Sequence, residues 1–461
     1  MSSEGPLYEL VARGNKDVFF YGELSKSKFL FDNSYESQVP SITELRRVPP
    51  LSTADFGRSV EFAFDLVGDL MKNPTLLIQL PSWLPPSVAA KADCSIITDL
   101  SGVTYGYTRG IAYFLFETIQ FFQDNILLQE FSGDTLWVMS KISGTLGVQK
   151  ILDDLTGDHD GTPLSIARAA APPTLRLQIP IIGTESSNVG FPQRAVTKHT
   201  YRLRCKLRKV EDLVESSDGR QKPFPWGQTF QQQLSQTTPP VQFKALVKTA
   251  VLPINLQLET RQIYVERDMQ QVLETTPIKI RFPRVFENVF TQGPQDYISV
   301  LAGGLSAVQR RIDGRHPAGR LIWYFRSLSD ILSNRLWKIN TNTNKPYYNT
   351  VSLLIAGRTR ESDLAPFVWR DIVNYSKEGK DSGLEISTMN WTLGEIPRLR
   401  FPRQDQDSTG AVNFTTADRP TFYINLANPG LSAITNLYVI EEGWSQFETD
   451  GYGRAELLSM N

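Results

Sequence analysis

The sequence predicts an all-β protein of two consecutive eight-stranded jelly-roll barrels, with short helical insertions in the loops. Two observations lead to this fold class. Short segments in which apolar and polar residues alternate, the pattern of a half-buried strand, recur along almost the whole 461-residue chain. Long, irregular loops separate these segments, which is more typical of jelly rolls than of immunoglobulin-like sandwiches. We therefore expect two successive groups of packed strands.

The chain is expected to have three parts. Residues 1–24 are an N-terminal arm, residues 25–266 a first jelly roll and residues 267–461 a second jelly roll. The arm is too short for a domain. The boundary between the rolls is placed at the most polar break between strand groups, ERDMQQVLETT at residues 266–276.

In the first half, alternation predicts several strands and spacing predicts one helix. Residues 59–80 alternate on both sides of a Gly-Asp pair, which predicts a hairpin. Residues 116–122 are an aromatic strand that we expect to be covered on both faces. Apolar residues three and four positions apart predict a helix within residues 134–155. Further strands are expected around residues 175–179, 201–207 and 254–258.

The second half repeats the strand pattern, and its most regular segment is DSTGAVNFTTADRPTFYINL at residues 407–426. Its two alternating limbs flank Pro420, which fixes its own backbone angle and lacks an amide donor, so a hairpin is predicted. A lone hairpin is barely stable in water, so a second sheet should cover it. Other strands are expected around residues 278–282, 321–325, 351–355, 384–392 and 433–442.

Composition favours an ordinary globular protein without a nucleic-acid partner. Apolar residues make up 41% of the chain and aromatic residues 11%, which is enough for two or three packed cores. The 48 Lys and Arg residues nearly balance the 49 Asp and Glu residues. Because the net charge is only −1, bulk electrostatics do not draw the chain to DNA or RNA.

Cysteine content and hydropathy favour a soluble chain that folds in a reducing compartment. Cys94 and Cys205 are the only cysteines, so no disulfide framework is expected. The start, MSSEGPLYEL, lacks the apolar core of a signal peptide. The longest apolar run, near residues 110–122, carries Glu117 and Gln120. It is also shorter than the roughly 18 residues of a membrane-spanning helix.

No pattern in the sequence predicts catalysis, a cofactor or a metal site. The three histidines, His159, His199 and His316, are too scattered to be the clustered ligands of a cupin-type metal site. No G-x-S-x-G elbow accompanies them, so a hydrolase is not favoured. We expect His199 at a strand end on the surface and His316 in a turn. The chain is therefore not expected to be an enzyme.

Two further motifs are interpreted as structural. One is an acidic cluster around Gly157, which could hold a cation but departs from the EF-hand spacing, so a solvated acidic loop is favoured. The other, Gly451-Tyr452-Gly453, is a fragment of a nucleotide-binding loop without a following βαβ unit, and terminal flexibility explains it. The acidic cluster consists of Asp153, Asp154, Asp158 and Asp160.

Basic residues lie along one face of the strand predicted at residues 201–207. They could meet acidic neighbours, a lipid surface or nucleic acid, but the solvated face or charged edge of a half-buried strand is the favoured interpretation. The row consists of Arg202, Arg204, Lys206 and Arg208.

Three tripeptides satisfy the N-glycosylation rule, at Asn374, Asn390 and Asn413. Such tripeptides often arise by chance. Without a signal peptide, the usual glycosylation machinery would not meet them.

Five segments, in order along nearly the whole chain, resemble the major capsid proteins of the nucleocytoplasmic large DNA viruses. LVARG at residues 10–14 is similar to the family's opening arm. Phe56-Gly57, followed by GDL at residues 68–70, resembles its first hairpin, and HP with LIW at residues 316–323 resembles a strand early in the second roll. Ser408, Gly410, Asn413 and Phe414 resemble the motif near the end of that roll, and NLYV at residues 436–439 resembles the closing strand. The match is loosest over residues 141–240.

The resemblance implies a structural role and a set of partners. It implies two jelly rolls per subunit and a homotrimer whose six similar barrels give a pseudo-hexagonal capsomer. The capsomers would build the icosahedral shell of a double-stranded DNA virus, marseillevirus-like or medusavirus-like. The implied partners are the chain itself, neighbouring capsomers, minor capsid and penton proteins and, through the arm, the face of an internal membrane. The implied location is the virion capsid, made and assembled in the host cytoplasm.

Two other functions remain open from the sequence. A carbohydrate-binding jelly roll could stack sugars on exposed Trp369, Trp391 and Trp444, although buried aromatic packing explains these residues more simply. A minor or penton-type capsid protein is the other alternative, but such proteins usually need only one jelly roll.

Overall fold

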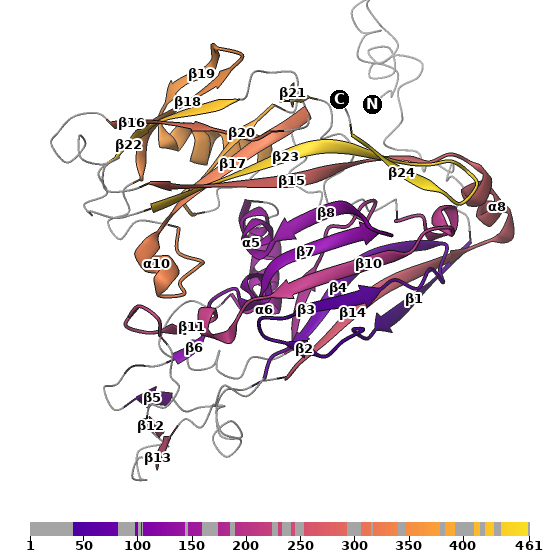
Figure 1. The fold of residues 1–461 in the computed structure, drawn as a ribbon, viewed down its shortest axis with the longest axis horizontal. Helices are drawn as coiled ribbons and strands as arrows, with labels where there is room; N and C mark the ends of the chain where they lie inside the picture. Colours follow the sequence, from indigo (N-terminus) through magenta and orange to yellow (C-terminus); the bar gives the residue numbers. More distant parts are fainter. Residues whose placement is uncertain are drawn as a thin grey trace, which may run out of the picture. The chain divides into compact units, whose positions relative to one another are not determined.

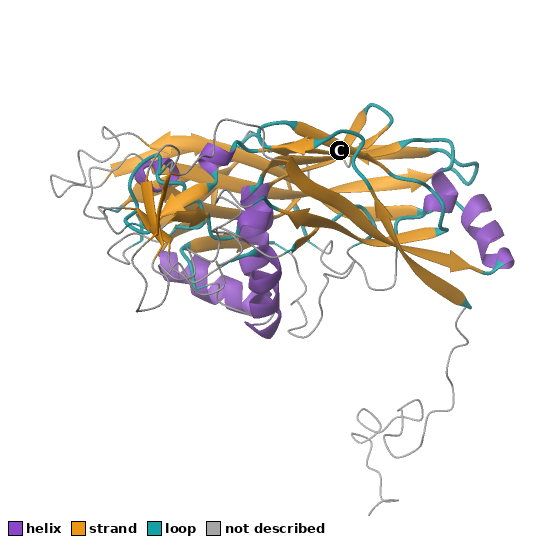
Figure 2. Ribbon diagram, turned by 90° about the horizontal axis from the view of Figure 1, so that it is seen from below, coloured by secondary structure: helices purple, strands orange, loops and turns teal. Residues whose placement is uncertain are grey.

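A computed structural model of the chain describes most of residues 40–461. The described ranges are 40–81, 97–99, 103, 105–142, 146–158, 174–184, 190–223, 229–232, 241–244, 253–292, 306–314, 317–339, 346–378, 383–391, 410–414, 420–427 and 435–459. Strands dominate these ranges, and the helices are short (Figure 2). The predicted arm, residues 1–24, lies outside the described residues.

Eight strands from the first half form two sheets. One sheet has the order β1 (Ser41–Val48), β14 (Pro253–Val265), β4 (Leu70–Gln79) and β9 (Leu175–Gln178), with β2 (Ala54–Asp55) added to β14. The other has the order β3 (Ser59–Ala63), β10 (Tyr201–Leu207), β7 (Phe116–Gln123) and β8 (Ile126–Ser132). Inward residues of both sheets share one hydrophobic core, so the sheets pack face to face. We call these eight strands the first roll.

Eight strands from the second half form two more sheets. One has the order β15 (Lys279–Gln292), β23 (Thr435–Thr449), β17 (Pro317–Ser327) and β20 (Ile386–Asn390). To this sheet are added β21 (Val412–Asn413) and β24 (Ala455–Ser459). The other has the order β16 (Ser306–Arg311), β22 (Thr421–Leu426), β18 (Tyr348–Ile355) and β19 (Arg358–Leu364). These eight strands enclose a second core and are called the second roll (Figure 1).

The two rolls have the same topology. When the eight strands of either roll are numbered along the chain, the sheet orders are 1-8-3-6 and 2-7-4-5. Every pair of successive strands except the fourth and fifth, which pair with each other, therefore crosses from one sheet to the other, as in an eight-stranded jelly roll built from two Greek keys. The predicted fold class, two consecutive jelly rolls, is confirmed. The duplication is a structural one, which no short sequence repeat reveals.

The smaller elements lie in the connections between these strands. The ribbons are β6 (Tyr105–Tyr107) with β11 (Val214–Ser216), and β12 (Thr229–Gln232) between β5 (Ile97–Asp99) and β13 (Val241–Lys244). The helices are α4 (Ile111–Phe114), α5 (Gly133–Ile142), α6 (Leu146–Thr156), η1 (Gln193–Val196), η2 (Val210–Asp212), α8 (Arg267–Thr275), α10 (Leu328–Leu332) and η3 (Val368–Glu378). None of the helices within the described ranges is long and apolar enough to span a bilayer.

Both predicted hairpins are wrong, although their strands exist. In the hairpin predicted at residues 59–80, β3 pairs with β10, whereas β4 pairs with β14 and β9 in the opposite sheet. In the hairpin predicted at residues 407–426, β21 pairs with β17, whereas β22 pairs with β16 and β18 in the opposite sheet. Alternation along a strand shows which side chains share a face, but it does not identify the neighbouring strand.

Coverage of the strand faces also differs from the prediction. Strand β7 was predicted to be covered on both faces. Only the face with Phe116, Ile119 and Phe121 is fully buried, and Glu117 on the other face is exposed. Strands that are buried on both faces are β17 and the central part of β23. The predicted helix within residues 134–155 is two helices, α5 and α6. The polar break at residues 266–276 forms α8, between β14 and β15, and the domain boundary there stays a prediction.

Candidate functional site: the junction between the two rolls

The two rolls meet on the outer face of the β15–β23–β17–β20 sheet (Figure 1). Leu321, Trp323 and Val439 point into the core of the second roll. Ile322 and Ile440, on the opposite face of the same strands, belong to the hydrophobic core of the first roll. One sheet therefore serves both rolls, and we call the contact surface the junction.

A carboxylate shared by two arginines lies at the centre of the junction. Asp134, in the first turn of α5, accepts a hydrogen bond from Nη1 of Arg326 on β17 at 2.7 Å and one from Nη2 of Arg208 next to β10. Arg326 is only 1% exposed. Its guanidinium lies 5.1 Å from the ring centroid of Tyr438, which stacks in parallel on Tyr324 with the centroids 4.8 Å apart. The ion pair thus links the first roll to the second.

The charges of this cluster stabilise one another. Burial alone would raise the pKa of Asp134, but Arg208 and Arg326 lower it to about 2. Burial alone would lower the pKa of Arg326, but Asp134 raises it. The carboxylate is therefore ionised at neutral pH, and removing it would leave two guanidinium groups in an interior that cannot solvate them.

A cavity of about 710 Å³ opens beside this cluster. Residues of β7, β8 and α5 line it on the first roll, and residues of β15, β17 and β23 line it on the second. Neither histidine nor cysteine is among the described residues that line it. Within the described part of the chain, no group of three metal-ligating side chains comes together either.

The segment that follows α10 inserts beside β11, which lies in the connection between β10 and β14 of the first roll. The buried Asn334 donates from Nδ2 to the carbonyl oxygens of Glu211 and Val214, each at 2.7 Å. Its own carbonyl accepts from the Thr108 hydroxyl at 2.8 Å. Trp337 donates from Nε1 to the Glu215 carboxylate at 2.9 Å. These hydrogen bonds connect the segment after α10, in the second roll, to residues of the first roll.

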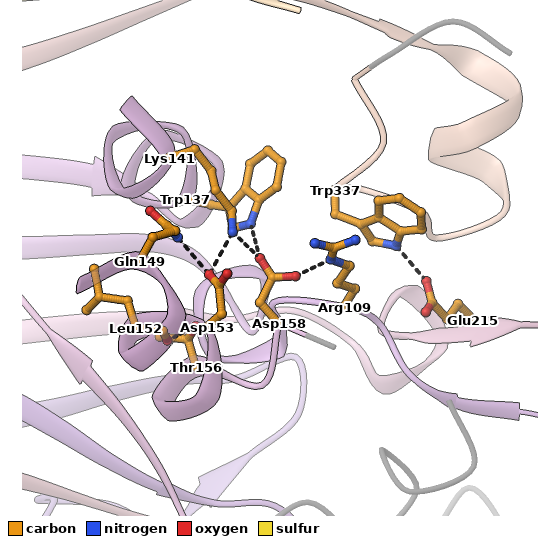
Figure 3. A network of polar contacts seen from close by, with 10 residues as sticks. All are labelled: Arg109, Trp137, Lys141, Gln149, Leu152, Asp153, Thr156, Asp158, Glu215 and Trp337. Carbon is orange, nitrogen blue, oxygen red and sulfur yellow. Dashed lines mark hydrogen bonds and ion pairs between the residues drawn. The ribbon is translucent and has the colours of Figure 1, made fainter. Parts of the chain in front are cut away.

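A polar network continues from this segment into the first roll (Figure 3). The Arg109 guanidinium lies 5.1 Å from the ring centroid of Trp337 and also pairs with Asp158. Asp158 accepts from Lys141 Nζ at 2.5 Å and from Trp137 Nε1 at 3.3 Å. Burial alone would raise the pKa of Asp158, but Arg109 and Lys141 lower it.

The interpretation of the acidic cluster as a solvated loop is therefore wrong for Asp158, whose side chain is fully buried. Asp153 also pairs with Lys141, at 2.7 Å. The two carboxylates are thus paired with cations of the chain itself, Lys141 for both and Arg109 for Asp158. Asp160 lies outside the described residues.

We expect Asn334→Gly to lower the free energy of unfolding by roughly 1–3 kcal/mol, because two buried carbonyl groups would lose their donor. Glycine keeps the left-handed backbone of this position (φ 59°) without strain. Guanidinium denaturation followed by tryptophan fluorescence measures the change. Asn73→Gly is the matched control, since Asn73 also has a positive φ of 48° but is exposed. Equal losses in the two variants would contradict this role of Asn334.

The other residues singled out in the sequence have structural surroundings. His199 Nδ1 lies 2.7 Å from Asp124 Oδ2 just before β10, as expected for a strand-end residue, but its side chain is half-buried rather than on the surface. His159 and His316 lie outside the described residues. Gly451 and Gly453 adopt positive φ values in the turn between β23 and β24, so terminal flexibility does not explain them.

The basic row on β10 meets acidic neighbours on adjacent strands. Arg204 pairs with Glu61 of β3 at 2.7 Å, and Lys206 pairs with Glu117 of β7 at 2.7 Å. Arg208 joins Asp134 at the junction. The Arg204 and Lys206 pairs agree with the solvated face of a half-buried strand, whereas Arg208 belongs to the buried cluster, and none of the three pairs gives support to a nucleic-acid surface.

The three glycosylation candidates differ in accessibility. Asn374 is fully buried on η3, where it donates to the Ile386 carbonyl at 3.1 Å and accepts from the Thr388 hydroxyl. This burial disfavours its modification in the folded chain. Asn390 and Asn413 are half-buried at the ends of β20 and β21, and they stay predictions.

The sequence reasoning missed the buried charges of the junction. A signal for them exists, because Arg320 and Arg326 interrupt the otherwise apolar strand PAGRLIWYFRS. A buried guanidinium requires a partner, which Glu442 supplies to Arg320 and Asp134 supplies to Arg326. The identities of these partners could not be read from the sequence.

Comparisons with known proteins place the fold. No protein-family model and no curated protein matches the chain. Among solved structures, PBCV-1 VP54, fitted into a reconstruction of the virophage Sputnik, has a TM-score of 0.70 and 11% identity over 94% of this chain and 100% of that one. A quasi-atomic model of the PBCV-1 virus capsid has a TM-score of 0.68, with the same identity and coverage. The Faustovirus major capsid protein has a TM-score of 0.63 and 11% identity over 97% of this chain and 94% of that one. The likeness extends over nearly the whole chain and shows that its fold is that of these capsid proteins.

Proposed function

We propose that the chain is a major capsid protein, three copies of which form a pseudo-hexagonal capsomer in the icosahedral shell of a double-stranded DNA virus. The observation that carries the proposal is the repeated 1-8-3-6 and 2-7-4-5 strand order in two rolls joined by a buried junction. Three such chains around a threefold axis present six similar rolls, and closed symmetry limits the assembly to that size. Similarity in fold to the Faustovirus major capsid protein supports the same function.

The proposal includes partners and a location. Capsomers contact neighbouring capsomers and the minor capsid and penton proteins. The arm of residues 1–24 lies on the inner side of the shell, against minor capsid proteins or the face of an internal membrane. The protein is made and assembled in the host cytoplasm and ends in the virion capsid. It has no catalytic role and requires no cofactor.

The mass of the purified protein in solution tests the proposal. We expect size-exclusion chromatography with light scattering to give about 156 kDa, three times the 52.0 kDa chain. The mass should not change on dilution across the micromolar range, because a closed trimer buries large lateral surfaces. A chain that stays at 52.0 kDa at every concentration would contradict the proposal.

The described surface gives less support to a carbohydrate-binding role. Trp369 and Trp444, two of the three candidate sugar-stacking residues, are buried at 3% and 7% exposure. Trp391 is half-buried and packs edge-on against Phe414, with the ring centroids 5.7 Å apart. Sugar binding by an isolated monomer on a glycan array would favour that function over the shell. A minor or penton-type capsid protein is disfavoured because two complete rolls are present.

A further inference from the structure

We infer that copies of this chain contact one another by repeating the junction between chains: β19 and η3 of one copy pack against the outer face of β1, β14 and β4 of the next. The inference rests on the proposed function, because it assumes a ring of copies. It goes further by assigning the two surfaces that meet. Each carries an exposed apolar side chain in the single chain, Ile372 on η3 and Leu45 on β1.

The junction inside the chain shows which parts of a roll make such a contact. The first roll contributes its fifth strand, β8, and the helix that follows it, α5. Gln129 of β8 donates to the Pro283 carbonyl of β15 at 3.3 Å, and Asp134 of α5 pairs with Arg326 of β17. The second roll contributes its first, third and eighth strands, β15, β17 and β23.

The shared topology identifies the equivalent parts in the other roll. The fifth strand of the second roll is β19, and the helix that follows it is η3. The first, third and eighth strands of the first roll are β1, β4 and β14. If contacts inside a chain and between chains alternate around a ring of three copies, these two surfaces must face each other. Strands β19 and β1 are labelled in Figure 1.

The helix η3 carries the first uncovered surface. Its inner face packs against β20 through Trp369 and Asn374, which are 3% and 0% exposed. Three large apolar side chains lie on the outer side of this helix. Phe367, just before the helix, is 54% exposed, and Ile372 and Tyr375, on the helix, are 53% and 54% exposed. At the equivalent place in the first roll, the apolar side chains of α5 are buried. A gathering of exposed apolar side chains of this kind marks an interaction surface.

The strand β1 carries the second uncovered surface. Leu45 of β1 shares a face with Arg47 and Glu259, and it is 55% exposed. In the equivalent strand of the second roll, β15, Phe282 is only 2% exposed because it lies in the junction. Arg47 and Arg176 both pair with Glu259 on this outer face, at 3.1 Å and 3.2 Å. An exposed apolar side chain bordered by charged pairs matches an interface with an apolar centre and a polar rim.

A charge placed on η3 tests the first surface. We expect Ile372→Asp to reduce the mass in solution from that of a trimer to that of a single chain, while circular dichroism and the melting temperature of the monomer show that it is folded. Val272→Asp is the matched control, because Val272 is 50% exposed on α8, outside both surfaces. This control should remain a trimer. An Ile372→Asp protein that stays trimeric, like the control, overturns the inference.

Chemical cross-linking tests whether β1 is the partner surface. In a Cys94→Ser background, the remaining cysteine, Cys205, is buried. We expect the Leu45→Cys, Ile372→Cys double variant to form covalent dimers and trimers with a short bismaleimide, whereas neither single variant does so. An intact trimer that gives no cross-link in the double variant overturns the assignment of β1.

The two proposals fail in different ways. A wild-type chain that is monomeric at every concentration removes the proposed trimer itself. A wild-type trimer that tolerates Ile372→Asp leaves the proposed function standing and removes only this inference.

Discussion

Replacing Asp134 with alanine is expected to lower the free energy of unfolding by roughly 3–5 kcal/mol, the cost of leaving buried charges without their partner. The Arg326 side chain is only 1% exposed and that of Arg208 is 19% exposed, so water can replace the lost carboxylate only in part, and least of all for Arg326. Guanidinium denaturation of the purified protein, followed by tryptophan fluorescence, measures the loss. The same variant should loosen the junction, because Asp134 lies on the first roll and Arg326 on the second.

The matched control is Asp65→Ala. Asp65 also accepts from an arginine, Arg46, at 3.1 Å, but its side chain is 55% exposed. An exposed pair of this kind contributes less than about 1 kcal/mol. Equal losses in Asp134→Ala and Asp65→Ala would show that the buried cluster contributes nothing beyond a surface ion pair.

Acid should weaken the same cluster. The pKa of Asp134 is lowered in the folded chain, from 3.8 to about 2, so its stabilising contribution is fully present above pH 4 and is lost as the pH falls through 2. Protonation removes about 2 kcal/mol, at 1.36 kcal/mol for each pKa unit. This is less than the loss of stability expected from Asp134→Ala, because a protonated Asp134 still fills its place and keeps part of its hydrogen bonding.

Glu215→Gln is expected to stabilise the protein at pH 8 by up to about 3 kcal/mol, at 1.36 kcal/mol for each pKa unit. Burial raises the pKa of Glu215 from 4.5 to about 7, against the opposing effects of Trp337, Arg335, Arg109 and Thr108. A carboxyl group whose pKa is raised by folding costs nothing below its unfolded pKa. It destabilises the folded chain increasingly as the pH rises through the folded value.

The test compares the two proteins at several pH values. Guanidinium midpoints of wild type and Glu215→Gln should coincide near pH 4.5 and diverge up to pH 8, with the variant more stable. The glutamine keeps an oxygen that can accept from Trp337 Nε1, so the contact between the rolls is retained. Glu117→Gln is the control, since Glu117 is 48% exposed beside Lys206 and should change stability by less than about 1 kcal/mol at either pH. A Glu215→Gln variant that is less stable than wild type at pH 8 would contradict the prediction.

Sequence alternation was sufficient to locate most of the strands. Residues 201–207, 254–258 and 321–325 were predicted to be strands, and they lie in β10, β14 and β17. This works because side chains on successive strand residues point to opposite faces, so burial of one face leaves a period of two in the sequence. The same local signal failed for both hairpins, where neighbouring strands belong to opposite sheets.

The junction was only partly predictable. The buried arginines of β17 are visible in the sequence as charges inside an apolar strand, but nothing near them in the chain indicates Asp134, which is 192 residues away. The acidic cluster shows the same limit. Asp158 resembles a loop residue in the sequence, whereas the structure buries it between Arg109 and Lys141.

The sequence by itself determined that the chain is an all-β protein with two successive groups of strands. Only the tertiary structure decided which strands pair, that both rolls share one strand order, and that a buried carboxylate joins them. The physical reason is the separation along the chain of the residues that interact. The pattern of burial depends on consecutive residues within each strand and is therefore visible in the sequence. Strand pairing and ion pairing join residues that only the folded chain brings together.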